Sequence, residues 1–170
     1  MRMTRLVSKS VLAFTVVAAA VLALGAAVAV AAPHFASAGA EVNSAGELVV
    51  SFDERGLGNE NIDYTLTADA TALYACINRG GKNPSAANKQ TFEGQVSGGA
   101  SIEPKNGRVR ASISAGPLAA PQFTCPKGQS RELAQVSYSN IVLTDTTNGV
   151  PITLPDVSRC LLPNIPDLCV

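Results

Sequence analysis

Apolar and polar residues alternate with a period of two through much of the chain, which is typical of β-strands with one buried face. In the clearest run, residues 62–76, every even position is apolar and Asp or Thr fills most odd positions. Because this run is long for one strand, a bend or bulge near Asp69-Ala70 is expected to divide it, with one part at each edge of a two-sheet packing. Leu73, Ala75 and Ile77 make the odd face apolar too, so the end of the run is expected to be buried on both sides.

Two shorter segments with the same period, residues 91–96 and 108–114, predict a hairpin. The Lys-Asn-Gly sequence at 105–107 lies between them and is expected at or near the tip of its turn. A further strand is predicted at residues 47–53, where Leu48, Val50 and Phe52 share one face.

The second half of the chain predicts one more long strand and its partner. Residues 132–144 contain strand-forming side chains whose phase shifts around Asn140, which indicates a bulge. Asn148-Gly149 is a strong hairpin signal, so residues 150–154 are expected to pair back on this strand. Core candidates in the long strand are Val136, Tyr138, Val142 and Leu143.

Beyond the first thirty or so residues, no segment keeps the 3.6-residue period of an amphipathic helix, so the fold is expected to be all-β. About seven short strands at this spacing predict a two-sheet sandwich of immunoglobulin-like architecture. The immunoglobulin hallmark pairs two cysteines with a buried tryptophan, and this chain contains no Trp. The prediction therefore concerns the architecture alone, at residues 32–154, followed by a proline-rich, irregular tail at residues 155–170.

The N-terminal residues 1–31 have the pattern of a signal peptide that forms a signal helix before the sandwich. Arg2, Arg5 and Lys9 precede an uncharged run from residue 11 to 32, and small residues at Ala29 and Ala31 fit a cleavage site near Ala31. The run is also long enough to cross a membrane, so an uncleaved, outward-facing anchor is the alternative. The sequence thus favours a secreted protein, with contact to the membrane only through this segment if it is retained.

The charge of the exported part excludes one class of partner. Three of the 13 cations and none of the 13 acids precede residue 32, which leaves a net charge of about −3 after cleavage. The sequence contains no basic stripe and no aromatic platform, so nucleic acid is not an expected partner. It also indicates no cofactor.

The four cysteines all lie in the exported part, and an even number there indicates disulfides. Three connectivities are open, of which the sequence favours Cys76–Cys125 and Cys160–Cys169. Zinc would be the other use of four thiols, but no C-x-x-C pair occurs. No metal site is therefore expected.

Catalytic side chains are scarce. His34 is the one histidine and would lie at the extreme N-terminus of the exported chain, which disfavours a serine–histidine mechanism. Asp53 with Glu54, or Asp63 with Asp69, could serve a small secreted hydrolase that uses carboxylates alone. These acids are more simply explained as solvated strand positions, so no catalytic residue is predicted and the hydrolase remains the alternative.

The segment 75–90 (ACINRGGKNPSAANKQ) is the main candidate for contact with a ligand. Successive amides around Gly80 and Gly81 could form an anion-binding nest, to which Arg79, Lys82 and Lys89 would add charge. Asn and Gly also accept the left-handed conformations that tight corners require. The sequence favours such a corner, held by Cys76, over a site for an anion or a protein partner.

Several motifs resemble a family of small exported proteins typical of actinobacteria. The resemblance covers roughly residues 33–149, and its longest motif is TADATALYACINRGGKNPSAANKQ at 67–90. The shorter motifs are PHF at 33–35, F-x-E-x-GLG at 52–58, CPKGQ at 125–129 and VSYSNIVLTDTTNG at 136–149. The resemblance implies export, a single domain and cleavage near Ala31, and it implies no catalytic residue.

Taken together, these patterns predict an exported, disulfide-stapled, non-enzymatic β-sandwich. Its expected role is binding or structural, outside the cell or in the cell envelope, with a cell-surface component or a protein as partner.

Overall fold

The computed structural model of the chain describes residues 31–81, 88–165 and 168–169, and every regular element that lies wholly within these residues is a β-strand. The strands are β1 (His34–Val42), β2 (Leu48–Arg55), β3 (Ile62–Asn78), β4 (Lys89–Ile102), β5 (Arg108–Ala115), β6 (Gln129–Asp145), β7 (Val150–Leu154) and β8 (Val157–Cys160). The all-β prediction is confirmed for these residues. They contain no helix that could span a lipid bilayer.

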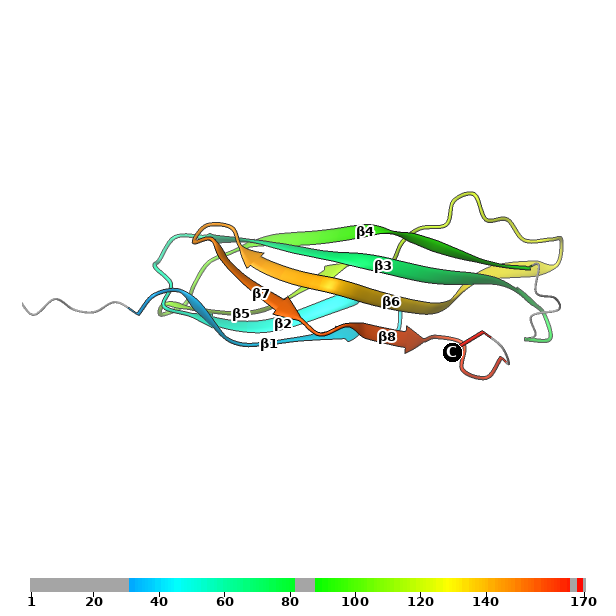
Figure 1. The fold of residues 1–170 in the computed structure, drawn as a ribbon, viewed down its shortest axis with the longest axis horizontal. Coiled ribbons are helices and arrows are strands. Elements are labelled where there is room, and N and C mark those ends of the chain that lie inside the picture. The colour runs from blue at the N-terminus through cyan, green and yellow to red at the C-terminus, as the bar shows by residue number, and fades with distance from the viewer. Residues whose placement is uncertain (1–30, 82–87, 166–167, 170) are drawn as a thin grey trace, which may run out of the picture.

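The strands form two antiparallel sheets in a β-sandwich-like arrangement (Figure 1). The smaller sheet has the order β1-β2-β5. The larger sheet has the order β4-β3-β6-β7, and β8 also pairs with β6. Alternating side chains from both sheets meet in one core, as the period of two predicts. Its fully enclosed members include Leu48, Val50, Leu66, Ile141 and Leu143.

The larger sheet is longer than the smaller one, and β3, β4 and β6 project beyond it at the right of Figure 1. Two other segments cover the projecting part. On the inner face, Ala120 and Phe123 from the β5–β6 connection pack against Cys76. On the outer face, Leu168 from the C-terminal tail packs against Ala75 and Ile77. The prediction that the end of the long alternating run is buried on both sides is therefore confirmed.

Each disulfide fastens one of these covering segments. Cys76–Cys125 ties the β5–β6 connection to the inner face of β3, and Cys160–Cys169 closes the tail into a loop beneath β6. This is the connectivity that the sequence favours. Arg131 holds the first segment as well, because its guanidinium donates to the carbonyl oxygens of Ala120 and Phe123.

The predicted division of the long run at Asp69-Ala70 is wrong. β3 is one continuous strand of 17 residues in the interior of its sheet, and its pairing with β4 is unbroken. The irregularity lies on the β6 side, where the register shifts opposite Thr67 and Asp69 and Asn140 has a φ of 50°. The predicted bulge near Asn140 is thus confirmed, and bulges of this kind increase the local twist of a strand.

The predicted hairpin between residues 91–96 and 108–114 is also wrong. β4 pairs with β3 and β5 pairs with β2, so the two strands belong to different sheets. The turn is where the sequence places it, and Asn106 and Gly107 have φ values of 53° and 71°. The turn carries the chain from one sheet to the other. β4 pairs with β3 over all 14 of its residues, whereas β5 is only 8 residues long.

The remaining differences lie near the two ends of the chain. β1 is a strand that no pattern indicates, and residues 157–160 of the predicted irregular tail form β8. Residues 150–154 pair with β6 as predicted. The predicted signal helix falls on residues 1–30, which lie outside the described residues.

Candidate functional site

The outer face of the smaller sheet brings three arginines around one aspartate. Side chains alternate along β2, so Phe52 and Glu54 point into the core while Asp53 and Arg55 point outward. In the register of β2 with β5, Asp53 lies opposite Arg110, and Arg55 lies opposite Arg108. Strand pairing alone therefore collects the four side chains that we call the arginine cluster: Arg55, Arg108, Arg110 and Asp53.

Asp53 is the hub of the arginine cluster. Arg108 grips it with two donors: Nε donates to Oδ1 at 2.6 Å, and Nη2 donates to Oδ2. Arg110 Nε and Arg55 Nη2 also donate to Oδ2, at 3.3 and 3.4 Å. The hydrogen bonds from Arg108, followed by those from Arg55 and Arg110, hold the pKa of Asp53 well below its usual range. The carboxylate is therefore ionised at neutral pH, and the cluster keeps a net charge of about +2.

The cluster presents much of this charge to solvent. The side chain of Asp53 is only 9% exposed, whereas that of Arg110 is 69% exposed and that of Arg55 is 52% exposed. A guanidinium group has five N–H donors, and the hydrogen bonds to Asp53 use only part of this capacity. Asp53 thus holds the guanidinium groups in place while they still face solvent. Because these side chains are already ordered, they would lose little conformational freedom on binding an anion.

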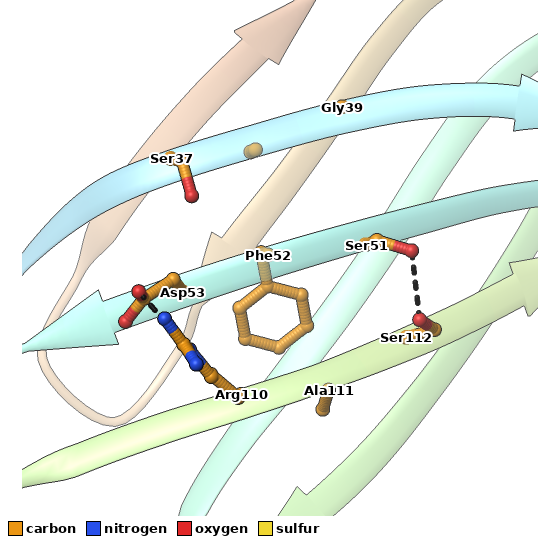
Figure 2. Close-up of a pocket in the computed structure, with 9 residues that line it drawn as sticks. Ser37, Gly39, Ser51, Phe52, Asp53, Arg110, Ala111 and Ser112 are labelled. Carbon is orange, nitrogen blue, oxygen red and sulfur yellow. Dashed lines mark hydrogen bonds and ion pairs between the residues drawn. The ribbon is translucent and has the colours of Figure 1, made fainter.

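A shallow hollow of about 610 Å³ adjoins the cluster and is open to solvent. Figure 2 shows Arg110 reaching from β5 towards Asp53 on β2, with Ser51 and Ser112 hydrogen-bonded beside them at 2.8 Å. On the third strand, Gly39 has no side chain to fill the space. The hollow is lined by Ser37, Ala38, Gly39, Ser51, Phe52, Asp53, Arg110, Ala111 and Ser112. Hydroxyl groups and a guanidinium group in a shallow surface suit hydrogen bonding to oxyanions better than enclosure of an apolar ligand.

The segment singled out in the sequence lies elsewhere. Gly80 and Gly81 follow β3, at the opposite end of the long axis from the β2–β3 connection beside the arginine cluster (Figure 1). The amide of Gly80 donates to Asn78 Oδ1 and the amide of Gly81 donates to the Asn78 carbonyl oxygen, both at 2.9 Å. Both amides of the predicted nest are therefore engaged in closing a corner.

Contact between the cations of that segment and an anion or a partner stays a prediction. Arg79 is exposed and borders a hollow with Gly128 and Gln129, and Lys89 begins β4. Lys82 lies outside the described residues. The structure thus places Arg79 and Lys89 near one end of the larger sheet and does not bring them to the arginine cluster.

The carboxylate pairs considered for a hydrolase are not assembled. Asp53 and Glu54 point to opposite faces of β2. The expectation that both are solvated strand positions is wrong, because Asp53 is nearly buried and Glu54 is fully buried. Asp63 and Asp69 share the outer face of β3, but six residues of strand separate them by roughly 20 Å, which is too far for paired catalytic carboxylates. Asp69 accepts hydrogen bonds from Gln95 and Asn140, so it is a bonded surface position.

Sequence reasoning missed a buried polar group between the sheets. Glu54 and Asp145 are fully buried, and Tyr64 donates its hydroxyl to Glu54 Oε2 at 2.7 Å. Desolvation, and the nearby charge of Asp145, raise the pKa of Glu54. Asp145 has its own partners, since the backbone N–H and side-chain amide of Asn148 donate to it at 2.8 and 2.6 Å. The alternation of Leu48, Val50 and Phe52, continued by two residues, would have placed Glu54 in the core.

This burial predicts an unusual dependence of stability on pH. Because the pKa of Glu54 is raised above its ordinary 4.5, the folded chain keeps a proton that the unfolded chain has released. The free energy of unfolding should therefore fall as pH rises above about 4.5. Glu54→Gln cannot ionise, so it should remove this fall and be more stable than wild type at pH 7, by about 1 to 3 kcal/mol.

Urea unfolding at a series of pH values measures this effect. Glu60→Gln is the matched control. Glu60 is exposed, so this substitution removes the same carboxyl group from the surface and not from the core. The account of Glu54 is wrong if the two variants have the same pH profile.

Among the described residues, no group of three or more His, Cys, Asp or Glu side chains converges as metal ligands do. No family model matches the chain, and no curated protein matches it.

Proposed function

We propose that this protein is an exported, non-enzymatic β-sandwich that binds anionic groups of a partner outside the cell or in the cell envelope through the arginine cluster. The observation that carries the proposal is the orientation of exposed guanidinium groups by the nearly buried Asp53. The two disulfides are consistent with an extracellular location. The resemblance to exported actinobacterial proteins supports the same compartment.

The shape of the site favours an extended partner over a small substrate. The hollow is shallow, and its lining combines serine hydroxyl groups and small side chains with Phe52, the Arg110 guanidinium and the Asp53 carboxylate, which already accepts hydrogen bonds from the arginines. Such a surface can follow a chain of phosphate or carboxylate groups, each held by charge and hydrogen bonds. Since the exported chain has a net charge of about −3, attraction to an anionic polymer would come from the local cluster and not from the overall charge.

We further propose that the sandwich is immunoglobulin-like in architecture. Two antiparallel sheets of short and long strands around one core support this. The chain departs from the immunoglobulin pattern in its cysteines, because Cys76 on β3 bonds Cys125 in a connection and not a second strand of the facing sheet. The likeness would therefore be one of architecture without the inter-sheet disulfide.

Inorganic polyphosphate is a suitable probe of the cluster. We expect Arg110→Glu to weaken its binding by at least about tenfold at low salt, since one exposed contact is lost and an opposing charge is added. Wild-type binding should itself weaken as salt rises. Fluorescence anisotropy with a labelled polyphosphate chain would measure both effects.

Arg79→Glu is the matched control, because it makes the same change of charge at the other end of the molecule. It should bind like wild type. Equal losses for the two variants would mean that net charge governs binding, and a loss confined to Arg79→Glu would place the site at the segment that the sequence singled out.

A further inference from the structure

The outer edge of β4 is a long strand edge that no other strand covers in the described part of the chain. β4 pairs with β3 from Ala75↔Lys89 to Ile62↔Ile102 without any shift of register. Its alternate residues are all exposed: Thr91, Glu93, Gln95, Ser97, Gly99 and Ser101. An edge of this kind presents unpaired backbone donors and acceptors that can template another strand.

The other sheet edges carry features that discourage such pairing. β7 and β8 are short, β7 contains Pro151, and β1 has an irregular register between Phe35 and Ser37. β5 bears Arg108 and Arg110, and its backbone at Ser114 lies directly against Gly98 of β4. By contrast, residues 94–102 of β4 contain no charge, no proline and no bulge.

We propose that β4 pairs antiparallel with β4 of a second copy of this chain, about a two-fold axis near Ser97, so that the larger sheet continues across both copies. A two-fold contact requires a surface that complements itself, and β4 does. The two-fold axis at Ser97 sets Glu93 opposite Ser101 and Gln95 opposite Gly99, so no like charges face each other between the two strands. The outward-facing residues Ser97, Gly99 and Ser101 are exposed and small, so their side chains would not clash across the axis on the outer face of the sheet.

This pairing does not depend on anion binding, although it would place two arginine clusters in one particle. The contribution of the edge would come from main-chain hydrogen bonds, as in other cases of strand addition. An extended segment of a different protein could use the same edge, and the experiment below separates that case from self-pairing.

Charge exchange at the axis tests the proposal. Ser97→Lys and Ser97→Glu each place like charges opposite one another in the dimer, while Ser97 is exposed and the monomer should fold normally. Each variant alone should dissociate more readily than wild type, by about fivefold or more in the dimer dissociation constant. An equal mixture of the two variants should recover dimers, because Lys then faces Glu.

Sedimentation equilibrium of the full exported chain measures these states, and Thr67→Lys is the control. Thr67 lies opposite Ser97 on β3, one strand inside the edge. The dimer dissociation constant of Thr67→Lys should therefore match that of wild type. The proposal is overturned if wild type remains monomeric up to about 1 mM, if neither Ser97 variant weakens the dimer, or if the mixture does not restore it.

Discussion

Replacing Cys76 and Cys125 by alanine is expected to lower the free energy of unfolding by about 4 kcal/mol. The bond joins residues 49 apart in the sequence, so its removal gives the unfolded chain many more conformations. It also frees the segment whose Ala120 and Phe123 cover the inner face of the projecting strands. Urea denaturation of the oxidised proteins at constant pH would measure the loss.

The Cys160–Cys169 bond provides the comparison within the same molecule. Its sequence separation is only 9, so the double alanine variant should lose somewhat under 3 kcal/mol. If removing Cys160–Cys169 lowers the free energy of unfolding as much as removing Cys76–Cys125 does, or more, then Cys76–Cys125 is not the more stabilising of the two disulfides.

Truncation of Tyr138 to alanine is expected to cost about 3 to 5 kcal/mol, the range for large buried aromatic side chains. Tyr138 is 1% exposed and lies on the inner face of β6. Its hydroxyl crosses the core to donate to the carbonyl oxygen of Gly46 at 2.6 Å, in the turn between β1 and β2. Burial raises the pKa of Tyr138 to about 12, so the hydroxyl remains a donor throughout the neutral range.

Tyr138→Phe separates the two contributions of this side chain. It keeps the ring and removes the hydrogen bond, so it should cost only about 0.5 to 1.5 kcal/mol. Thermal or urea unfolding would measure the loss of stability in Tyr138→Ala and in Tyr138→Phe. If phenylalanine is as costly as alanine, the hydrogen bond to Gly46 and not the filling of the core is what Tyr138 contributes.

The local features of the strands could be predicted because side-chain alternation is a local property. Leu48, Val50 and Phe52 are buried as the period of two requires, and the phase shift at Asn140 correctly indicated a bulge. β1 could not be predicted because its irregularity near residue 36 breaks the alternation, and two of its four inward residues, Ala38 and Ala40, are small.

Strand partners could not be predicted in the same way. The alternation in β4 and β5 states which side chains face the core, but it carries no information about which strand lies beside each one. Their short connection suggested a hairpin, whereas β4 pairs with β3 along its whole length. Long-range pairing of this kind depends on the packing of the whole sandwich.

The arginine cluster could not be predicted either, because it also depends on which strands pair. Asp53 is visible in the sequence as an outward residue of its strand, and Arg108 and Arg110 as outward residues of theirs. Only the pairing of β2 with β5, which are not consecutive, brings the carboxylate to the guanidinium groups. The segment at 75–90 drew attention because its charges and glycines are adjacent in sequence, yet its two glycine amides close a corner.

The most direct test of the proposed binding site is a titration of the ¹⁵N-labelled protein with inorganic polyphosphate, followed by backbone amide chemical shifts. The largest changes should occur at Arg55, Arg108 and Arg110 and at the serines of the adjoining hollow, and they should diminish with added salt. Changes centred on Arg79 and Lys89, or no change at any amide, would contradict the proposed site.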